Sequence, residues 1–188
     1  MNSNTSISAD NGELLPLRHV STRLVDRNPY WEYRHDRYIT AKEEEADYWY
    51  AFTHGSVFVI ARDHAGRYVL TRQVRYLNGR TSVEFPGGGL PAGANALEQA
   101  QRELKEETGY EAMRWSAIGE FNPMNGITNE ICHVFLAEDL TQGEARPEAT
   151  EQIEVVLLTK DEVQSMCAQN TIWDGMSLAA WMLLCSRT

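Results

Sequence analysis

The amino-acid sequence predicts an α/β (α+β) protein in which helices cover both sides of a β-sheet. Three observations support this prediction: short runs rich in aromatic and β-branched residues, one strongly amphipathic helical pattern between them, and two further helical segments near the C-terminus. Strands that are interrupted by helices in this way usually build one sheet with helices packed on its faces. At 188 residues, the chain is long enough to bury one sizeable core.

The N-terminal part of the chain contains two segments of different composition. Residues 1–12 are rich in Ser and Asn, and we expect them to be disordered. Residues 13–54 are dense in aromatic side chains, which predicts an added antiparallel sheet whose rings pack onto the core. Two other roles stay open for these rings. Aromatic and Arg residues are enriched at protein interfaces, and Trp31 or Tyr33 could stack on a nucleobase.

The main domain is predicted over residues 55–188. Strands are predicted at residues 49–52, 56–62, 68–75, 115–122, 131–137 and 153–158. The turn at Ala65 and Gly66 joins the second and third of these strands into a hairpin. Asp161 and Asp174 are placed to cap two C-terminal helices, over residues 162–168 and from 174 to about 186.

The helix predicted after the Gly/Pro-rich loop at residues 84–93 is the most informative element. Asn95 is placed to cap it, and Glu98 follows three residues later, as in a capping box. Gly109 stands where a helix commonly ends. Leu97, Ala100 and Leu104 form an apolar stripe, so one side of this helix is expected to face the core.

Three carboxylates share a different face of the same helix. Glu103, Glu106 and Glu107 have the i, i+3 and i+4 spacing that brings side chains together. Like charges at this spacing repel one another by a few tenths of a kcal/mol per pair, whereas Mg²⁺ accepts several oxygen ligands and offsets the repulsion. A solvated acidic helix face is the alternative. The glycine loop beside the capped helix favours a metal and phosphate site.

Residues 88–110 resemble the Nudix box, a family motif of the form Gly, five residues, Glu, seven residues, then Arg-Glu-apolar-any-Glu-Glu-any-Gly-apolar. The matching positions are Gly88, Arg102, Glu103, Leu104, Glu106, Glu107, Gly109 and Tyr110. One position departs from the motif, because Ala94 stands where the family has its first Glu. The resemblance implies the Nudix fold, a mixed sheet sandwiched between helices, and it extends from about residue 28 to the C-terminus.

The resemblance also implies roles for individual residues. In the family, the counterparts of Glu103, Glu106 and Glu107 bind Mg²⁺ or Mn²⁺, together with a backbone carbonyl at the position of Gly87. The counterpart of Arg102 orients the first of these carboxylates through an ion pair. The Glu that is missing at position 94 normally supports this arrangement. We hypothesise that Glu98 partly replaces it, because a Glu four residues before an Arg pairs well with it on a helix.

Segments outside the box resemble ADP-ribose and nucleoside-diphosphate-sugar pyrophosphatases. In these enzymes, an Arg at the position of Arg75 and a Glu at the position of Glu84 line or brace the site. Glu151 best matches the catalytic base of their acidic loop, with Glu148 as the alternative. Glu130 is a candidate contact to substrate or metal. Relatives with this N-terminal layout are commonly homodimers, so the resemblance implies a homodimer here.

The implied activity is hydrolysis of the diphosphate bond of an ADP-ribose-like nucleoside diphosphate sugar to a nucleoside monophosphate and a sugar phosphate. Asn125 and Gly126 replace the Pro-Gly pair that is usual in ADP-ribose pyrophosphatases, and this departure leaves two alternatives open. One is a Nudix hydrolase for another substrate, such as GDP-mannose or a nucleoside triphosphate. The other is a Nudix module that binds a nucleotide sugar without cleaving it.

Composition narrows the partners. A net charge of −10 argues against non-specific nucleic-acid binding, which depends on Lys and Arg neutralising phosphates. The longest apolar run, residues 178–185, is too short to span a bilayer, and residues 1–12 lack the pattern of a signal peptide. The three cysteines show neither metal-ligand nor redox spacing. We therefore expect a cytoplasmic protein with reduced thiols that acts on a small molecule.

Overall fold

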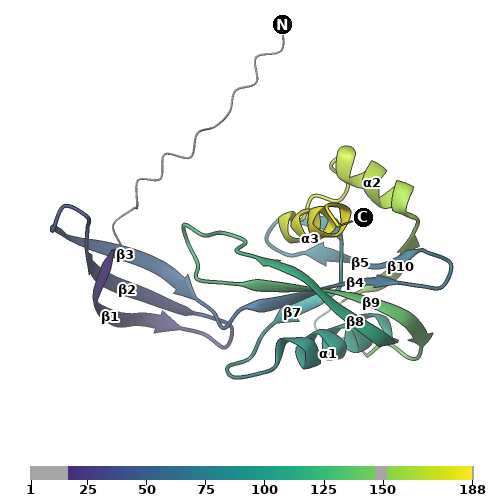
Figure 1. Ribbon diagram of the computed structural model, residues 1–188, viewed down its shortest axis with the longest axis horizontal. Helices are drawn as coiled ribbons and strands as arrows, with labels where there is room; N and C mark the ends of the chain where they lie inside the picture. The colour runs from purple at the N-terminus through teal and green to yellow at the C-terminus, as the bar shows by residue number, and fades with distance from the viewer. Residues whose placement is uncertain (1–16, 147–151, 188) are drawn as a thin grey trace, which may run out of the picture.

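The computed structural model describes residues 17–146 and 152–187 of the chain. The segment expected to be disordered, residues 1–12, lies outside the described residues, and so do Glu148 and Glu151. Within the described part, the chain forms a main domain and a separate three-stranded sheet at its N-terminal side (Figure 1).

The main domain is built on a seven-stranded sheet. Its strands are β4 (Ser56–Arg62), β5 (Tyr68–Arg75), β6 (Arg80–Glu84), β7 (Gly87–Gly89), β8 (Tyr110–Phe121), β9 (Cys132–Gln142) and β10 (Glu154–Leu158). Five of them follow the order β10-β5-β4-β9-β8, while β6 pairs with β5 and β7 pairs with β4. Strands β4 and β9 run parallel and the other pairs run antiparallel, so the sheet is mixed, as expected.

Helices cover both faces of this sheet. Helix α1 (Ala96–Thr108) lies on one face, and α2 (Lys160–Ala168) and α3 (Gly175–Cys185) lie on the other (Figure 1). Central strand β4 alternates between the two layers: Val57 and Val59 belong to the core under α1, whereas Ile60 belongs to the core under α3. Burial of both faces of β4 explains why its sequence is apolar almost throughout. The predicted fold class is confirmed.

For two of the three helices, the N-cap residue is the one that the sequence predicts. Asn95 caps α1 by accepting hydrogen bonds from the backbone N–H groups of the first helical turn, and Asp174 caps α3 in the same way. The prediction that Asp161 caps α2 was wrong. Thr159 caps this helix through a reciprocal capping box with Glu162. Asp161 lies in the first turn instead, where the helix dipole favours a negative charge.

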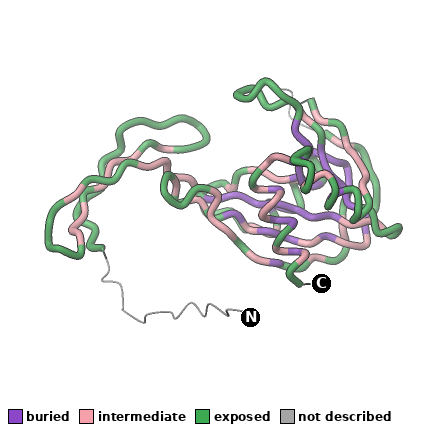
Figure 2. The backbone as a smooth tube through the Cα atoms, turned by 90° about the horizontal axis from the view of Figure 1, so that it is seen from above, coloured by how far each residue is buried: buried purple, intermediate pink, exposed green. Residues whose placement is uncertain are grey.

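The N-terminal sheet projects from the main domain. Its antiparallel strands are β1 (Arg18–Arg27), β2 (Glu32–Ile39) and β3 (Glu45–Phe52). Buried residues are confined to the main domain, while this sheet is exposed or half-buried along its whole length (Figure 2). The expectation that its aromatic rings pack onto the core was therefore wrong for most of them. Many of the rings contact each other across the strands, as Tyr33 and Trp49 do with centroids 5.8 Å apart.

One loop of the main domain ties the N-terminal sheet down. The Tyr48 hydroxyl donates to the carbonyl of Gly126 at 2.9 Å, and the side chain of Asn129 exchanges two hydrogen bonds with the backbone of Thr53. Ala51 also forms an isolated bridge to Thr128. These contacts fix the direction in which β3 enters β4. None of the helices in the described part of the chain has the length and apolar content that crossing a bilayer requires.

Candidate active site

The rotation of α1 about its axis decides which side chains reach the site. Ala100 and Leu104 are fully buried in the core under the helix, and Gly109 ends the helix in the left-handed conformation, with φ of 75°. Anchoring this apolar stripe leaves Glu103 and Glu106 at the surface of a pocket. Glu107, one position further round, is buried, with 6% of its surface exposed.

The glycine loop lies directly against the first carboxylate of the helix. Gly87, Gly88 and Gly89 form β7, which pairs with β4. A Cβ atom at Gly88 would stand 2.6 Å from Oε1 of Glu103, and one at Gly87 would stand 2.3 Å from the carbonyl oxygen of Val57. Both distances are too short for a side chain. Glycine at these two positions therefore lets the loop backbone approach both the strand and the carboxylate.

Arg102 is connected to Glu103 through a third side chain. Nη2 of Arg102 donates to Oε1 of Gln99, and Nε2 of Gln99 donates to Oε1 of Glu103. The predicted ion pair between Glu98 and Arg102 is absent from the ion pairs of the described residues. Gln99, one residue further along the helix, makes the contact because it lies on the buried side of the helix whereas Glu98 is exposed.

Arg75 and Glu84 form a second, deeper pair. Nε of Arg75 donates to Oε1 of Glu84 at 2.8 Å, a second bond joins Nη2 to Oε2, and the Glu84 side chain is only 3% exposed. The hydrogen bond to Glu84 raises the pKa of Arg75, burial opposes the rise, and the negative charges of Glu84, Asp174 and Glu107 add to it. Glu107 thus lies in the electrostatic reach of this pair.

A pocket of about 720 Å³ opens beside α1. Three kinds of structure line it: the helix through Gln99, Arg102, Glu103 and Glu106, the loop at residues 89–92, and the N-terminal segment through Pro29, Tyr30 and His54. A smaller pocket of about 330 Å³ shares the last three residues and adds Trp31. The turn between β1 and β2 therefore forms one wall of the site, within the same chain.

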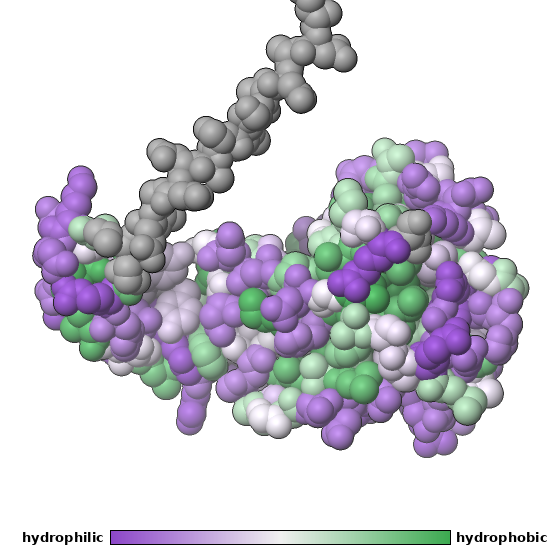
Figure 3. Space-filling model, in the orientation of Figure 1, coloured by the Kyte–Doolittle hydropathy of each residue, from purple (hydrophilic) through white to green (hydrophobic). Residues whose placement is uncertain are grey.

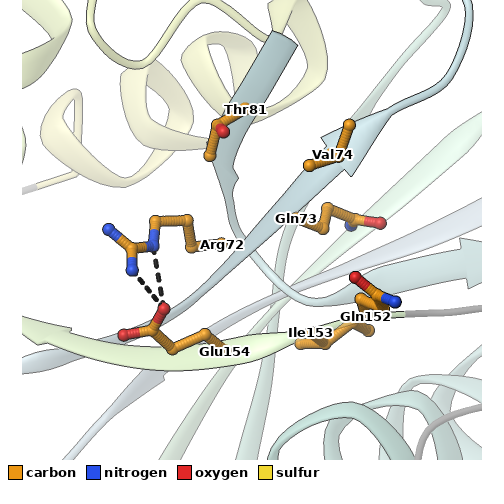
Figure 4. A pocket seen from close by; sticks show the side chains of 7 residues that line it. All are labelled: Arg72, Gln73, Val74, Thr81, Gln152, Ile153 and Glu154. Atoms are coloured by element: carbon orange, nitrogen blue, oxygen red, sulfur yellow. Dashed lines mark hydrogen bonds and ion pairs between the residues drawn. The ribbon is translucent and has the colours of Figure 1, made fainter. Parts of the chain in front are cut away.

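Another hollow lies at the edge of the sheet, between β5, β6 and β10 (Figure 4). It measures about 520 Å³ and is lined by Arg72, Gln73, Val74, Thr81, Gln152, Ile153 and Glu154. Arg72 and Glu154 are paired across its floor, with Nε to Oε2 at 3.0 Å. Glu151, the predicted base, lies outside the described residues.

The chain matches known proteins over most of its length. The family model described as the NUDIX domain matches residues 52–178. The chain belongs to the Nudix family. An ADP-ribose pyrophosphatase of Bacillus subtilis (strain 168) is 35% identical over 128 residues, which cover 67% of this chain and 69% of that protein. A methanol dehydrogenase activator of Bacillus methanolicus is 32% identical over the same shares of both chains.

A solved structure shares the fold. The crystal structure of an ADP compounds hydrolase superposes with a TM-score of 0.78, at 16% identity, and the match covers 92% of this chain and 94% of that one. The coverage includes the N-terminal region as well as the Nudix domain, because residues 52–178 alone make up a smaller share of the chain. Together, the comparisons identify a Nudix pyrophosphohydrolase of the group that includes ADP-ribose pyrophosphatases.

Nudix hydrolases generally use divalent metal ions, and the residues of this site suit such an ion. Glu103, Glu106 and Glu107 offer carboxylate oxygens, the ligands that Mg²⁺ prefers, and Gly88 leaves the room that Glu103 occupies. Among the described residues, no three acidic, His or Cys side chains stand close enough to form a complete metal cage. Mg²⁺ is commonly held by one or two carboxylates plus substrate phosphates, so the donor set fits a site that the substrate completes.

The structure brings most of the predicted site residues of this Nudix protein together in two groups. Arg102, Glu103 and Glu106 line the larger pocket, while Arg75, Glu84 and Glu107 lie together in or near the buried ion pair. Glu130 accepts a hydrogen bond at 2.6 Å from the hydroxyl of Ser56, which pairs with Gly89 of the loop. Trp31 lines the smaller pocket. Gly87 lies in β7, and whether its carbonyl binds a metal stays a prediction.

Sequence reasoning missed three residues of the site. Gln99 was passed over because Glu98 has the better charge for Arg102, and the burial of its neighbour Ala100 was the available signal. Tyr30 and His54 line the pocket from outside the Nudix box. No local pattern marks them, because their proximity depends on how the N-terminal sheet is placed against the main domain.

Proposed function

We propose that this Nudix hydrolase cleaves the diphosphate bond of an ADP-ribose-like nucleoside diphosphate sugar, with Mg²⁺ or Mn²⁺ as the metal. The observation that carries the proposal is the pocket of about 720 Å³, in which Arg102, Glu103 and Glu106 lie beside the glycine loop. The similarity to an ADP-ribose pyrophosphatase over two thirds of both chains supports the choice of substrate.

The acidic face of α1 would hold the metal. Glu103, Glu106 and Glu107 are the proposed ligands, with the carbonyl of Gly87. A divalent ion held there supplies positive charge against the diphosphate and makes water easier to deprotonate.

The remaining groups of the chain would position the substrate and move the proton. Glu151, or Glu148 in its place, would take the proton from the attacking water, a role that typically contributes about 10²–10⁴-fold to the rate. The water oxygen forms a new bond to phosphorus while the bridging P–O bond breaks, giving a nucleoside monophosphate and a sugar phosphate. The ion pair between Arg75 and Glu84 would support the site. Trp31 would stack on the base of the substrate, and Glu130 would contact the substrate.

Product analysis by mass spectrometry tests the proposal. Purified protein with Mg²⁺ is offered ADP-ribose, GDP-mannose, UDP-glucose and nucleoside triphosphates, and Glu107→Gln serves as the inactive control. We expect metal-dependent release of AMP and ribose 5-phosphate, with the Gln variant slower by at least about 10²-fold, since it loses a ligand to the ion that supports the reaction. Near wild-type activity of Glu107→Gln would refute the ligand assignment.

Two other outcomes would redirect the proposal. Cleavage of GDP-mannose or a triphosphate in preference to ADP-ribose would keep the chemistry and change the substrate. Binding of a sugar nucleotide without cleavage would identify a sensor module, with Ala94 as the residue to examine first.

We also propose a homodimer and a reducing compartment such as the cytoplasm. The exposed apolar and aromatic side chains of the N-terminal sheet support the first part of this proposal. The three cysteines support the second part, since all of them carry free thiols. The negative net charge supports a small-molecule partner over a nucleic acid.

A further inference from the structure

Gln99 is an unusual side chain for its place in the fold. It lies on α1 between the core and the pocket, with 5% of its surface exposed, and both ends of its amide are used. The oxygen accepts from Nη2 of Arg102, and the nitrogen donates to Oε1 of Glu103. These two partners determine the orientation of the amide. If it were reversed, its NH₂ group would face the guanidinium of Arg102 and its oxygen would face the carboxylate of Glu103.

Helix geometry explains how one residue reaches both partners. Gln99 precedes Arg102 by three positions and Glu103 by four, and these are the two spacings at which side chains meet on a helix. Arg102 and Glu103 are adjacent in the chain, so their side chains leave the helix in different directions. The amide of Gln99 lies between those directions and links the two groups.

The link restricts Glu103 at a point where restriction matters. Glu103 and Glu106 lie three positions apart and line the same pocket, so their like charges repel one another and favour rotamers that point apart. The Gln99 amide holds Glu103 against Gly88, where there is no side chain in the way. A carboxylate held in place before the ion arrives loses less conformational freedom on binding it.

We propose that Gln99 is a positioning residue that fixes Glu103 for metal binding and connects it to Arg102. The Nudix box has a supporting Glu at position 94, where this chain has Ala. Ala94 has no polar side chain, and Gln99 supplies a hydrogen bond to Glu103 in its place. The inference rests on the proposed function, because it takes Glu103 to be a metal ligand. Gln99 acts through Glu103 and takes no part in the reaction itself.

Mn²⁺ binding to the metal-free protein, measured by isothermal titration calorimetry, tests the inference without relying on turnover. Gln99→Met keeps the length of the side chain and removes both hydrogen bonds. We expect it to bind Mn²⁺ about 10-fold more weakly, the lower end of the range for partners that orient metal ligands. Gln101→Met is the matched control, an exposed Gln on the same helix, and should stay within twofold of wild type.

A double mutant shows whether Gln99 acts through Glu103. In a Glu103→Gln background, Gln99→Met should add less than twofold, because the group that it positions is already gone. If Gln99→Met binds Mn²⁺ like wild type, or if its effect is undiminished in the Glu103→Gln background, the inference is wrong. If Gln99→Met fails to fold, Gln99→Asn replaces it in the same titration, because its shorter side chain cannot bring the amide to both partners.

Failure of the proposed function would look different. In that case, wild-type protein would not bind Mn²⁺, or Glu103→Gln alone would bind it as tightly as wild type. Either result removes the ligand assignment, and the positioning role is overturned with it. Weak binding by Glu103→Gln combined with normal binding by Gln99→Met overturns the positioning role alone.

Discussion

At the scale of single residues, Gly88 and Gly89 provide a matched pair that isolates the contact between the glycine loop and the helix. Both lie in β7, but a Cβ at Gly88 would stand 2.6 Å from Oε1 of Glu103, whereas one at Gly89 would meet nothing within 4 Å. The atom in the way at Gly88 is the end of a flexible side chain. Glu103 can therefore rotate away, and the fold should tolerate the substitution.

We expect Gly88→Ala to weaken Mn²⁺ binding by about 10-fold or more, because it pushes Glu103 out of its place. Its free energy of unfolding should stay within about 0.5 kcal/mol of wild type, as for most substitutions outside the core. Gly89→Ala should change neither quantity. Calorimetric titration with Mn²⁺ and urea unfolding of both variants give the comparison, and equal binding by the two variants would contradict it.

The two arginines of β5 provide a second matched pair, this time for stability. Arg75 pairs with Glu84, whose side chain is 3% exposed, whereas Arg72 pairs with Glu154 in an ion pair that is more than half exposed on both sides. Removing Arg75 leaves a buried carboxylate without its main partner, which is far more costly than breaking a surface pair.

Urea unfolding should therefore separate the two positions. Arg75→Met is expected to lower the free energy of unfolding by about 1–3 kcal/mol, below the figure for a fully buried pair because the guanidinium is half exposed. Arg72→Met should cost under about 1 kcal/mol. Similar losses at both positions would show that burial of Glu84 contributes little.

The sequence predicts part of this residue-scale detail. Helical spacing predicts one shared face for Glu103, Glu106 and Glu107, but only Glu103 and Glu106 line the same pocket, because Glu107 is buried. The resemblance to relatives links Arg75 with Glu84. Spacing does not show that Arg102 contacts Gln99, because Glu98 and Gln99 both lie one turn before it. The choice depends on how the helix rotates to bury Ala100 and Leu104, and this rotation is set by the sheet beneath it.

At the scale of secondary-structure elements, one carboxylate links three neighbouring strands. Glu138 on β9 accepts hydrogen bonds from Arg62 on β4 and from Arg114 on β8. Burial raises the pKa of Glu138, but the hydrogen bond and charge of Arg62, with those of Arg114, outweigh it, so the pKa lies below its usual value. The charged form is thus favoured in the folded protein, and it contributes stability above the pKa of the unfolded chain.

This stability should be lost as the pH falls through the lowered pKa of Glu138. At pH 7, we expect Glu138→Gln to reduce the free energy of unfolding by about 1 kcal/mol, since both arginines are partly exposed. The difference from wild type should shrink below about pH 4.3, where Glu becomes protonated in the unfolded chain. Urea unfolding between pH 7 and pH 3 measures it, with the exposed Glu111→Gln as control; a difference independent of pH would contradict the account.

The elements of the main domain could be predicted better than those of the N-terminal sheet. Strand β4 and the β4–β5 hairpin were identified from apolar runs and a turn signal, because both faces of β4 are buried. Strand β1 mixes polar and aliphatic residues and is exposed throughout, and β2 mixes polar and aromatic residues and is mostly half-buried. Neither has a periodic pattern that would define its ends. The start of α2 was misplaced because Asp161 and Thr159 are both suitable caps.

At the scale of the whole molecule, the N-terminal sheet and the residues next to its strands expose several large apolar side chains. Leu17, Val20, Leu24, Val25, Trp31 and Trp49 are each at least 40% exposed. Green, hydrophobic patches are visible on this sheet among hydrophilic residues (Figure 3). Exposed apolar patches of this kind commonly mark interfaces. The sheet also reaches the pocket through Tyr30, so an interface on it would stabilise a wall of the site.

We therefore expect the protein in solution to have a mass near twice the 21.4 kDa of one chain, as measured by size-exclusion chromatography with light scattering. Leu24→Glu, in the exposed strand β1, should shift it toward the mass of one chain, because a buried unpaired charge is costly at an interface. Met113→Glu is the control, since Met113 is also an exposed apolar residue but lies on β8 of the main domain. A monomeric wild-type protein would show that there is no such interface. A dimer that withstands Leu24→Glu but not Met113→Glu would place the interface on the main domain.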